Sequence, residues 1–210
     1  MYLFKFLEKI NTECNTINSI PLKALRMDKS KNRRGISDYL KLNLSSCDYL
    51  NIKHKNNKKL IIFIEISDIK KQIENLENKR KLKITDVNME DIEKIEDRNC
   101  KEVIEKNLKN LKRKEIKKII LNELRKKVLE SIIIFCKLKN NFKIKEKNLK
   151  DVDFMFCLIL CNNLKDSQLP IIEELKGDLN NIMSNVISSV KIIPLTNEQE
   201  IKEYIKKCYT

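Results

Sequence analysis

The stretch "CDYLNIKHKNNKKLIIFIEIS", residues 47–67, decides the predicted fold. Its apolar segments "CDYLNIK" and "LIIFIEI" predict two strands, and the Asn-rich "HKNNKK" between them is typical of a hairpin turn. The unbroken apolar run of the second segment indicates a strand that is buried on both faces. Each segment also carries a carboxylate, Asp48 or Glu65. Burying a carboxylate in a strand is costly unless another group compensates its charge.

A turn centred on Asn56 and Asn57 places Asp48 directly opposite Glu65, because both are equally distant from the turn. Like charges in this arrangement destabilise a sheet unless a cation, a shared proton or a basic side chain compensates them. Two carboxylates are also how proteins hold Mg²⁺, which keeps several waters in its coordination shell. The pair is therefore either a metal site or two carboxylates at the edge of a sheet.

The remaining sequence predicts one α/β (α+β) domain over residues 1–210, a mixed central sheet of about five strands flanked by helices. The other three strands are expected over 36–44, 153–161 and 190–195, and a basic loop over 21–35. Helices are expected over 2–15, 69–80, 88–98, 99–138, 169–189 and 197–207, the longest with Ile116, Ile120, Leu124, Val128 and Ile132 at four-residue spacing.

Residues 69–114 form a long helical insertion in this pattern. The segment is rich in Glu and Lys and has too little apolar surface to make a domain alone, so a helical hairpin is expected. Such a hairpin is either a solvated arm or the surface that contacts a partner protein or a second copy of the chain.

The formal net charge of +14 favours a polyanionic partner such as nucleic acid. Most of the charge is lysine, however, and a chain rich in Lys, Asn and Ile is also what an AT-rich genome encodes, so a solvated surface is an equal alternative. Within the basic loop, Lys31, Arg33 and Arg34 are candidates for contact with a phosphate backbone. A solvated loop is again the alternative.

Cysteine and histidine usage excludes several kinds of site. Seven cysteines, an odd number without paired short spacings or a secretory signal, predict a reduced, cytoplasmic chain, with Cys157 and Cys161 as small buried residues. The single His54 leaves Cys/His zinc sites and Ser-His or Cys-His triads without the residues they need. No run approaches 18 uncharged residues, so no membrane partner is expected.

A helix, a three-stranded meander with Asp48 on its second strand and Glu65 on its third, then a helix and a further strand, resembles the core of the restriction-endonuclease-like superfamily, the PD-(D/E)XK nucleases. The resemblance covers residues 1–68 and 115–195. It implies a nuclease-like domain in which Asp48 and Glu65 are catalytic and bind Mg²⁺ or Mn²⁺. It also implies that Glu8, on the first helix, is the additional acid that some members carry.

The sequence departs from the family at Ser67, which stands where the family has its catalytic lysine. Lys70 or Lys71, one turn further on, is the expected substitute. The resemblance thus implies a metal-dependent nuclease or nuclease-like subunit acting on nucleic acid, similar to the compact modules of antiviral defence and mobile-element systems. The alternative is a catalytically inactive scaffold subunit that assembles with partner proteins through residues 69–114.

Overall fold

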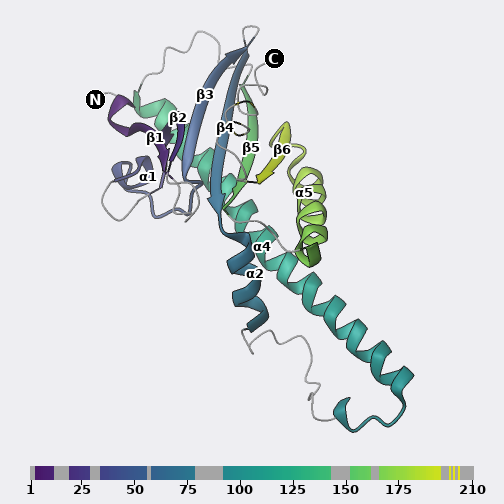
Figure 1. Cartoon of the computed structure of the whole chain (residues 1–210). Helices are drawn as coiled ribbons and strands as arrows, with labels where there is room; N and C mark the ends of the chain where they lie inside the picture. The colour runs from purple at the N-terminus through teal and green to yellow at the C-terminus, as the bar shows by residue number, and fades with distance from the viewer. Residues whose placement is uncertain are drawn as a thin grey trace.

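A computed structural model describes residues 3–11, 19–28, 34–55, 58–78, 92–142, 152–161, 166–194, 199, 201 and 203 (Figure 1). It contains a six-stranded mixed sheet whose strands follow chain order, so the predicted mixed α/β fold is confirmed. The strands are β1 (Leu7–Asn11), β2 (Ser19–Arg26), β3 (Tyr49–Lys55), β4 (Lys58–Ser67), β5 (Val152–Leu160) and β6 (Ser189–Pro194). The pairs β1–β2, β2–β3 and β3–β4 are antiparallel, whereas β4–β5 and β5–β6 are parallel.

Helices supply the connections that parallel strands need. Between β4 and β5 the chain forms α2 and the long helix α4, and between β5 and β6 it forms α5. Their bounds, with those of the short helices, are α1 (Ile36–Tyr39), α2 (Ile69–Asn78), α4 (Arg98–Phe142), α5 (Leu169–Met183) and 3-10 turns at Leu3–Phe6 and Asp166–Gln168. Within the described part of the chain, no helix has the combination of length and apolar character required to cross a membrane.

The β3–β4 hairpin forms in the predicted register, from Lys55 opposite Lys58 to Tyr49 opposite Ile64. Strand β4 is buried on both faces, as its apolar run predicts. Ile61 and Phe63 face the core that includes α4, and Ile62 and Ile64 face a second, smaller core on the other side of the sheet. The hairpin is the centre of the sheet, because β3 and β4 are the third and fourth of its six strands.

The prediction of a helix over residues 2–15 is wrong. The chain makes one 3-10 turn, Leu3–Phe6, and then strand β1, which pairs antiparallel with β2. Residues 12–15 lie outside the described ranges. The apolar residues do have helical spacing. Helix propensity is a weak preference, however, and pairing with β2 stabilises the strand more.

The basic loop predicted over 21–35 is wrong for its first part, because Ser19–Arg26 is strand β2. A proline cannot donate a ladder hydrogen bond, so Pro21 is an unusual residue within a strand. In the structure the β1–β2 register shifts between Lys9 and Ile10, and the residues opposite them are Lys23 and Ile20. Pro21 therefore lies at a bulge, where no ladder hydrogen bond is lost.

The strand predicted over 36–44 is also wrong, because Ile36–Tyr39 is the short helix α1. Ile36 and Ser37 are buried, and the Ser37 hydroxyl donates to the Met27 carbonyl over 2.9 Å. A Cβ on Gly35 would overlap the carbonyl oxygens of Met27 and Asp28, so this close approach requires glycine. The alternation of apolar residues predicts a strand here, but packing against the end of β2 makes the segment a helix.

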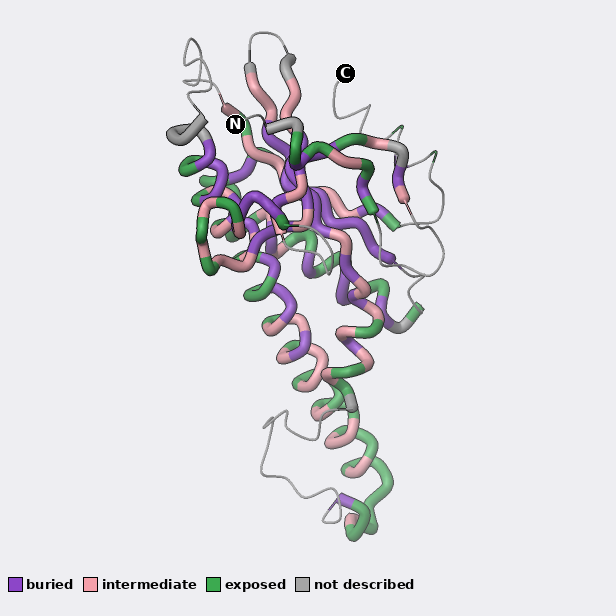
Figure 2. Tube along the Cα trace, turned by 90° about the vertical axis from the view of Figure 1, so that its left-hand side faces the viewer, coloured by how far each residue is buried: buried purple, intermediate pink, exposed green. Residues whose placement is uncertain are grey.

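Helix α4 confirms the predicted long helix, and Ile116, Ile120, Leu124 and Val128 are buried against the sheet. Figure 1 shows its first half projecting away from the sheet beside α2, and Figure 2 shows that burial is concentrated in the second half. Of the helix expected over 88–98, the described residues contain only a helical turn at 92–94. The helix expected over 197–207 lies outside the described residues except for 199, 201 and 203.

The cysteines at the end of β5 are buried, as predicted for Cys157 and Cys161. Cys161 is disulfide-bonded, so the expectation of a wholly reduced chain is wrong at that position.

Candidate functional site

The two predicted carboxylates lie next to each other on the sheet face that α4 covers. Asp48 immediately precedes β3, and one further step of the observed register places it opposite Glu65 on β4. The Asp48 Oδ2 atom accepts a hydrogen bond of 2.8 Å from the Ile66 N–H, which holds its carboxylate against the neighbouring strand. Its main-chain carbonyl accepts from the Met27 N–H over 2.9 Å, which fixes the residue from the side of β2 as well.

The cationic group opposite these acids is Lys127, which the sequence reasoning missed. Its Nζ atom lies 2.5 Å from Glu65 Oε1 and donates a hydrogen bond to it. Helix α4 positions the lysine, because Lys127 stands on the same face as the buried Leu124 and Ser131, three residues before and four after it. The sequence does contain a signal for Lys127: it is a lysine on the apolar face of a predicted helix.

Burial dominates the electrostatics of this cluster. The Glu65 carboxyl is only 2% exposed, and this burial, with the nearby charge of Asp48, raises its pKa to about 8 against the opposing effect of Lys127. Burial also raises the pKa of Asp48, and the hydrogen bond from the Ile66 N–H partly offsets that effect. Burial alone would lower the pKa of the Lys127 ammonium, but its contacts with Glu65 raise the pKa above the ordinary value.

One oxygen of the cluster lacks a partner. Glu65 Oε2 is buried and receives no hydrogen bond from any described residue. A buried carboxylate oxygen left in this state is costly unless it binds a proton, a water molecule or a cation.

The donor set is compatible with a hard divalent cation. Among the described residues there is no cluster of three or more His, Cys, Asp or Glu side chains that could hold a metal. A cation at Asp48 and Glu65 would therefore have two protein carboxylates and complete its shell with water. Mg²⁺ is commonly bound in this way, because it retains several of its waters.

The neighbouring polar residues have structural roles. Ser67 is buried on β4, and its hydroxyl accepts a hydrogen bond of 2.9 Å from the Gln72 amide of α2. The Cys47 N–H donates to the Ser131 hydroxyl of α4 over 2.8 Å. Burial raises the pKa of the Cys47 thiol well above its ordinary value, so this thiol is a poor nucleophile.

Lys70 and Lys71, the expected substitutes for the family's lysine, lie on the first turn of α2. Lys71 is exposed and its backbone N–H donates to Asp68 Oδ1 over 3.0 Å. The structure gives neither ammonium a hydrogen bond or ion pair with Glu65, and within the described chain that contact is made by Lys127.

Glu8, the additional acid implied by the resemblance, is not part of this cluster. It lies on β1 instead of a helix, and its Oε1 atom accepts a hydrogen bond of 2.5 Å from Arg26 Nε and one of 3.3 Å from the Tyr49 hydroxyl. Tyr49 belongs to the smaller core, on the sheet face opposite Lys127. Glu8 therefore cannot join Asp48 and Glu65 without crossing the sheet.

Of the residues proposed to contact a phosphate backbone, only Arg34 is described. It is exposed, stands just before α1, and lines a pocket together with Arg26. Lys31 and Arg33 lie outside the described residues. Comparison with known proteins identifies no matching family model, curated protein or solved structure.

Proposed function

We propose that this chain is a metal-dependent nuclease or nuclease-like subunit that acts on nucleic acid. The observation that supports the proposal is the meeting of Asp48 and Glu65 on one sheet face, with the Lys127 ammonium 2.5 Å from Glu65. Two carboxylates and a lysine are the chemical groups that the resemblance to PD-(D/E)XK nucleases implies. In this chain the lysine comes from a helix that packs on the sheet, and Ser67 occupies its usual position on the strand.

In the proposed site, Asp48 and Glu65 hold Mg²⁺ or Mn²⁺. Such a cation supplies a water of lowered pKa and stabilises negative charge on a phosphodiester. Lys127 compensates the Glu65 carboxylate, and its ammonium is a positive charge beside the place where negative charge would develop. The buried surroundings strengthen each of these interactions, because water screens them weakly there.

The charge of the chain suits a polyanionic substrate. Helix α4 alone carries fourteen Lys and Arg against five Glu, an excess of nine positive charges. Arg34 adds an exposed cation near the end of β2, and Lys31 and Arg33 remain candidates for backbone contact. An antiviral or mobile-element setting stays an analogy to similar compact modules.

A second candidate function is an inactive scaffold subunit with the same fold. The 2% exposure of Glu65 and its closed ion pair with Lys127 favour it, because a substrate phosphate must reach the metal ligands. In such a protein the three charges only stabilise the sheet–helix contact. The projecting half of α4 would then serve assembly with partner proteins or a second copy.

Metal titration separates the two functions. For a nuclease, Mg²⁺ or Mn²⁺ should raise the melting temperature of the wild type, since a ligand at a hundred times its Kd adds about 2.7 kcal/mol of stability. Asp48→Asn and Glu65→Gln should abolish this rise. No rise in the wild type at saturating metal would leave the scaffold as the function.

Cleavage of plasmid DNA and of RNA in Mn²⁺ then tests catalysis. Lys127→Met should remove cleavage yet retain the metal-dependent rise in melting temperature, because it leaves both carboxylates in place. Lys126→Met is the matched control, since Lys126 is the exposed neighbour and makes only a 4.0 Å pair with Glu130. Equal cleavage by the wild type and Glu65→Gln would reveal a contaminating nuclease and remove the proposal.

A further inference from the structure

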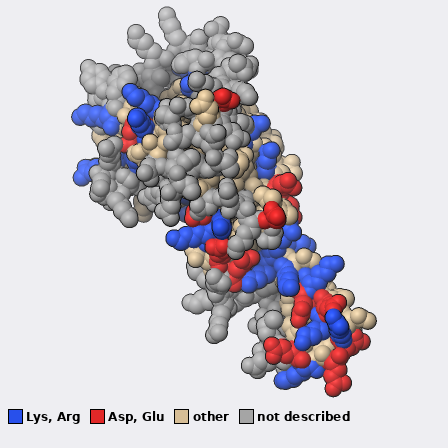
Figure 3. Space-filling model, viewed as in Figure 1, with Lys and Arg blue, Asp and Glu red and all other residues tan. Residues whose placement is uncertain are grey.

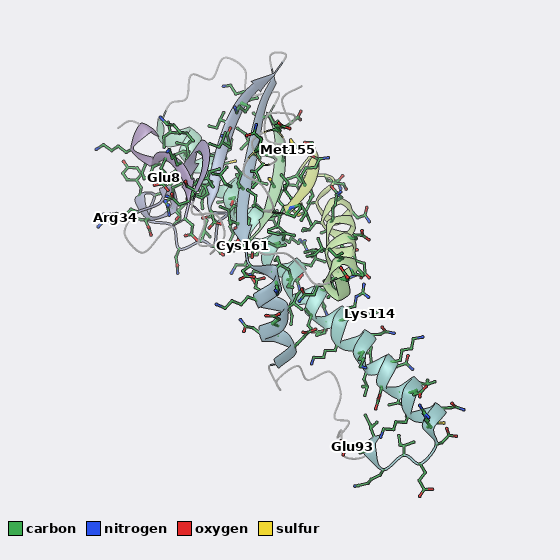
Figure 4. The ribbon with its side chains drawn as sticks, in the orientation of Figure 1. Glu8, Arg34, Glu93, Lys114, Met155 and Cys161 are labelled. Atoms are coloured by element: carbon green, nitrogen blue, oxygen red, sulfur yellow. The ribbon has the colours of Figure 1, made fainter. Side chains whose placement is uncertain are left out.

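A second polar site lies at the β1 edge of the sheet. A pocket of about 670 Å³ lies between β1, the end of β2 and the α1 region, and its lining residues do not include Asp48, Glu65 or Lys127. This volume is in the range of small-ligand sites. Figure 4 labels two of its residues, Glu8 and Arg34, at the opposite end of the molecule from the projecting half of α4.

The charged residues of the pocket favour an anion. Four cationic side chains line it, against the two carboxylates of Glu8 and Asp38: Lys5, Arg26, Arg34 and Lys41. Glu8 is engaged by Arg26, and Asp38 Oδ2 accepts a hydrogen bond of 3.3 Å from the Gly35 N–H.

Three of the four cations remain available to a ligand. Lys5, Arg34 and Lys41 are exposed and form no ion pair with another described residue. A pocket rimmed by cations in excess attracts phosphate or carboxylate groups from solution.

An aromatic wall adjoins these cations. The rings of Phe6 and Tyr39 lie 5.9 Å apart at an angle of 56°, and Tyr39 is 44% exposed while Phe6 is buried behind it. Leu7, also on the lining, is 38% exposed. An exposed ring beside apolar surface suits stacking with a planar ligand ring.

The backbone at Lys41 is a separate sign that this place is specialised. Lys41 directly follows the C-cap of α1 and has a φ of 54°, and it is the non-glycine residue with positive φ among those the structure describes. Its N–H donates to the Asp38 carbonyl over 3.1 Å, the kind of helix end at which glycine is preferred. A lysine is less favourable than a glycine in this backbone conformation, and strained positions of this kind concentrate at functional sites.

We infer that this pocket binds a nucleoside phosphate, either free or as part of a nucleic acid strand. Arg34, Lys41 and Lys5 contact the phosphate, and Tyr39 stacks on the base. Arg26 holds Glu8 and so keeps the floor of the pocket in place. The inference does not depend on hydrolysis at Asp48 and Glu65, because no residue of that cluster lines the pocket.

Binding is measured in EDTA, so that metal-dependent cleavage plays no part. The probes are AMP, adenosine, and one oligodeoxynucleotide with and without a 5′-phosphate, titrated calorimetrically at low and high salt. The wild type should bind AMP or the oligonucleotides, more weakly at high salt, and should bind adenosine much more weakly than AMP. Preference for AMP and the 5′-phosphorylated strand indicates a free or terminal nucleotide, and equal binding of both strands indicates internal phosphates.

Three variants test the residues. Arg34→Gln should weaken binding about threefold to tenfold, the usual effect of losing one charge-assisted contact. Lys114→Gln is its matched control, because Lys114 is exposed on α4, away from Arg34 in Figure 4, and should bind as the wild type does.

Lys41→Gly separates folding from binding. Glycine suits the positive φ, so this variant should melt at or above the wild-type temperature while binding more weakly. The inference is overturned if the wild type binds none of the probes, or if Arg34→Gln and Lys41→Gly both bind with wild-type affinity. A metal-dependent rise in melting temperature with no probe binding would sustain the nuclease proposal and remove this one.

Discussion

At the scale of single residues, the unusual feature is a carboxyl group inside an apolar sheet. Glu65 lies on the same face of β4 as the buried Ile61 and Phe63, and Lys127 is its ion-pair partner. Removing one partner of a buried ion pair is strongly destabilising, whereas the intact pair adds little net stability. The pair therefore indicates a function more than it explains the stability of the fold.

Glu65 should make the protein less stable as the pH rises. Its folded pKa of about 8 exceeds the ordinary value of 4.5, so the folded state binds a proton that the unfolded state has lost. Between these pH values the free energy of unfolding should fall as pH rises, by at most about 1.4 kcal/mol per pH unit for one such group. The Lys127 ammonium stays charged throughout, because its pKa is raised above 10.5.

Urea unfolding in EDTA across this pH range measures the effect. Glu65→Gln should flatten most of the slope, since the amide does not titrate and its oxygen can still accept from Lys127. Glu173→Gln, an exposed position on α5, is the control and should retain the slope. An unchanged slope in Glu65→Gln would assign the pH dependence to another group.

At the scale of elements, close packing fixes the start of α1. Gly35 is extended, with φ −86° and ψ 178°, so its requirement is space and not a special backbone angle. Backbone carbonyls of Met27 and Asp28 occupy the position of a side chain. At Gly177, within α5, the place that a Cβ would take has no neighbouring side chain within 4 Å in the described part of the chain, so a methyl group there would meet open space.

The two glycines should respond in opposite directions to alanine. Gly35→Ala should lower the free energy of unfolding by about 1–3 kcal/mol, because the backbone must move to admit the methyl group. Gly177→Ala should raise it by about 0.5–1 kcal/mol, since alanine reduces the entropy lost in forming a helix. Chemical denaturation of both variants tests this, and a stabilised Gly35→Ala would show that α1 is not packed against the end of β2.

At the scale of the whole molecule, a sheet body carries a helix that extends beyond it. Helix α4 is held against the rest of the molecule by its buried stripe and by ion pairs of Arg113 and Lys117 with Glu174 of α5. Exposed ion pairs contribute little, so the apolar stripe holds the helix in place. In the projecting half, the basic and acidic side chains are interspersed over the visible face (Figure 3), and Val103 is 58% exposed.

Hydrogen exchange should therefore be uneven along α4. Amides of residues 116–138 should be protected nearly as well as those of β4, whereas amides of residues 98–111 should exchange much faster, because few buried contacts oppose their local opening. Mass spectrometry of peptides from dilute protein measures the gradient. Protection of 98–111 that increases with protein concentration would show that the projecting half contacts a second copy of the chain.

Much of this fold could be predicted because its signals are local. The register of the β3–β4 hairpin follows from the turn and the apolar runs, β5 follows from its own apolar run, and α4 follows from its periodicity. The juxtaposition of Asp48 and Glu65 followed from the same register. By contrast, β1 and β2 were missed, because these segments become strands through pairing with neighbouring strands and not through their own apolar pattern.

The sequence by itself determined a mixed α/β sheet with two facing acids and a long helix with one apolar stripe. Only the tertiary structure decided that Lys127, 62 residues after Glu65, brings the compensating charge, and that Arg34 and Lys41 share a pocket with β1. The physical reason is the separation along the chain over which each kind of interaction acts. Turns and periodicity act between near neighbours in the chain, whereas the partner of a buried charge is set by which helix face packs onto which strand.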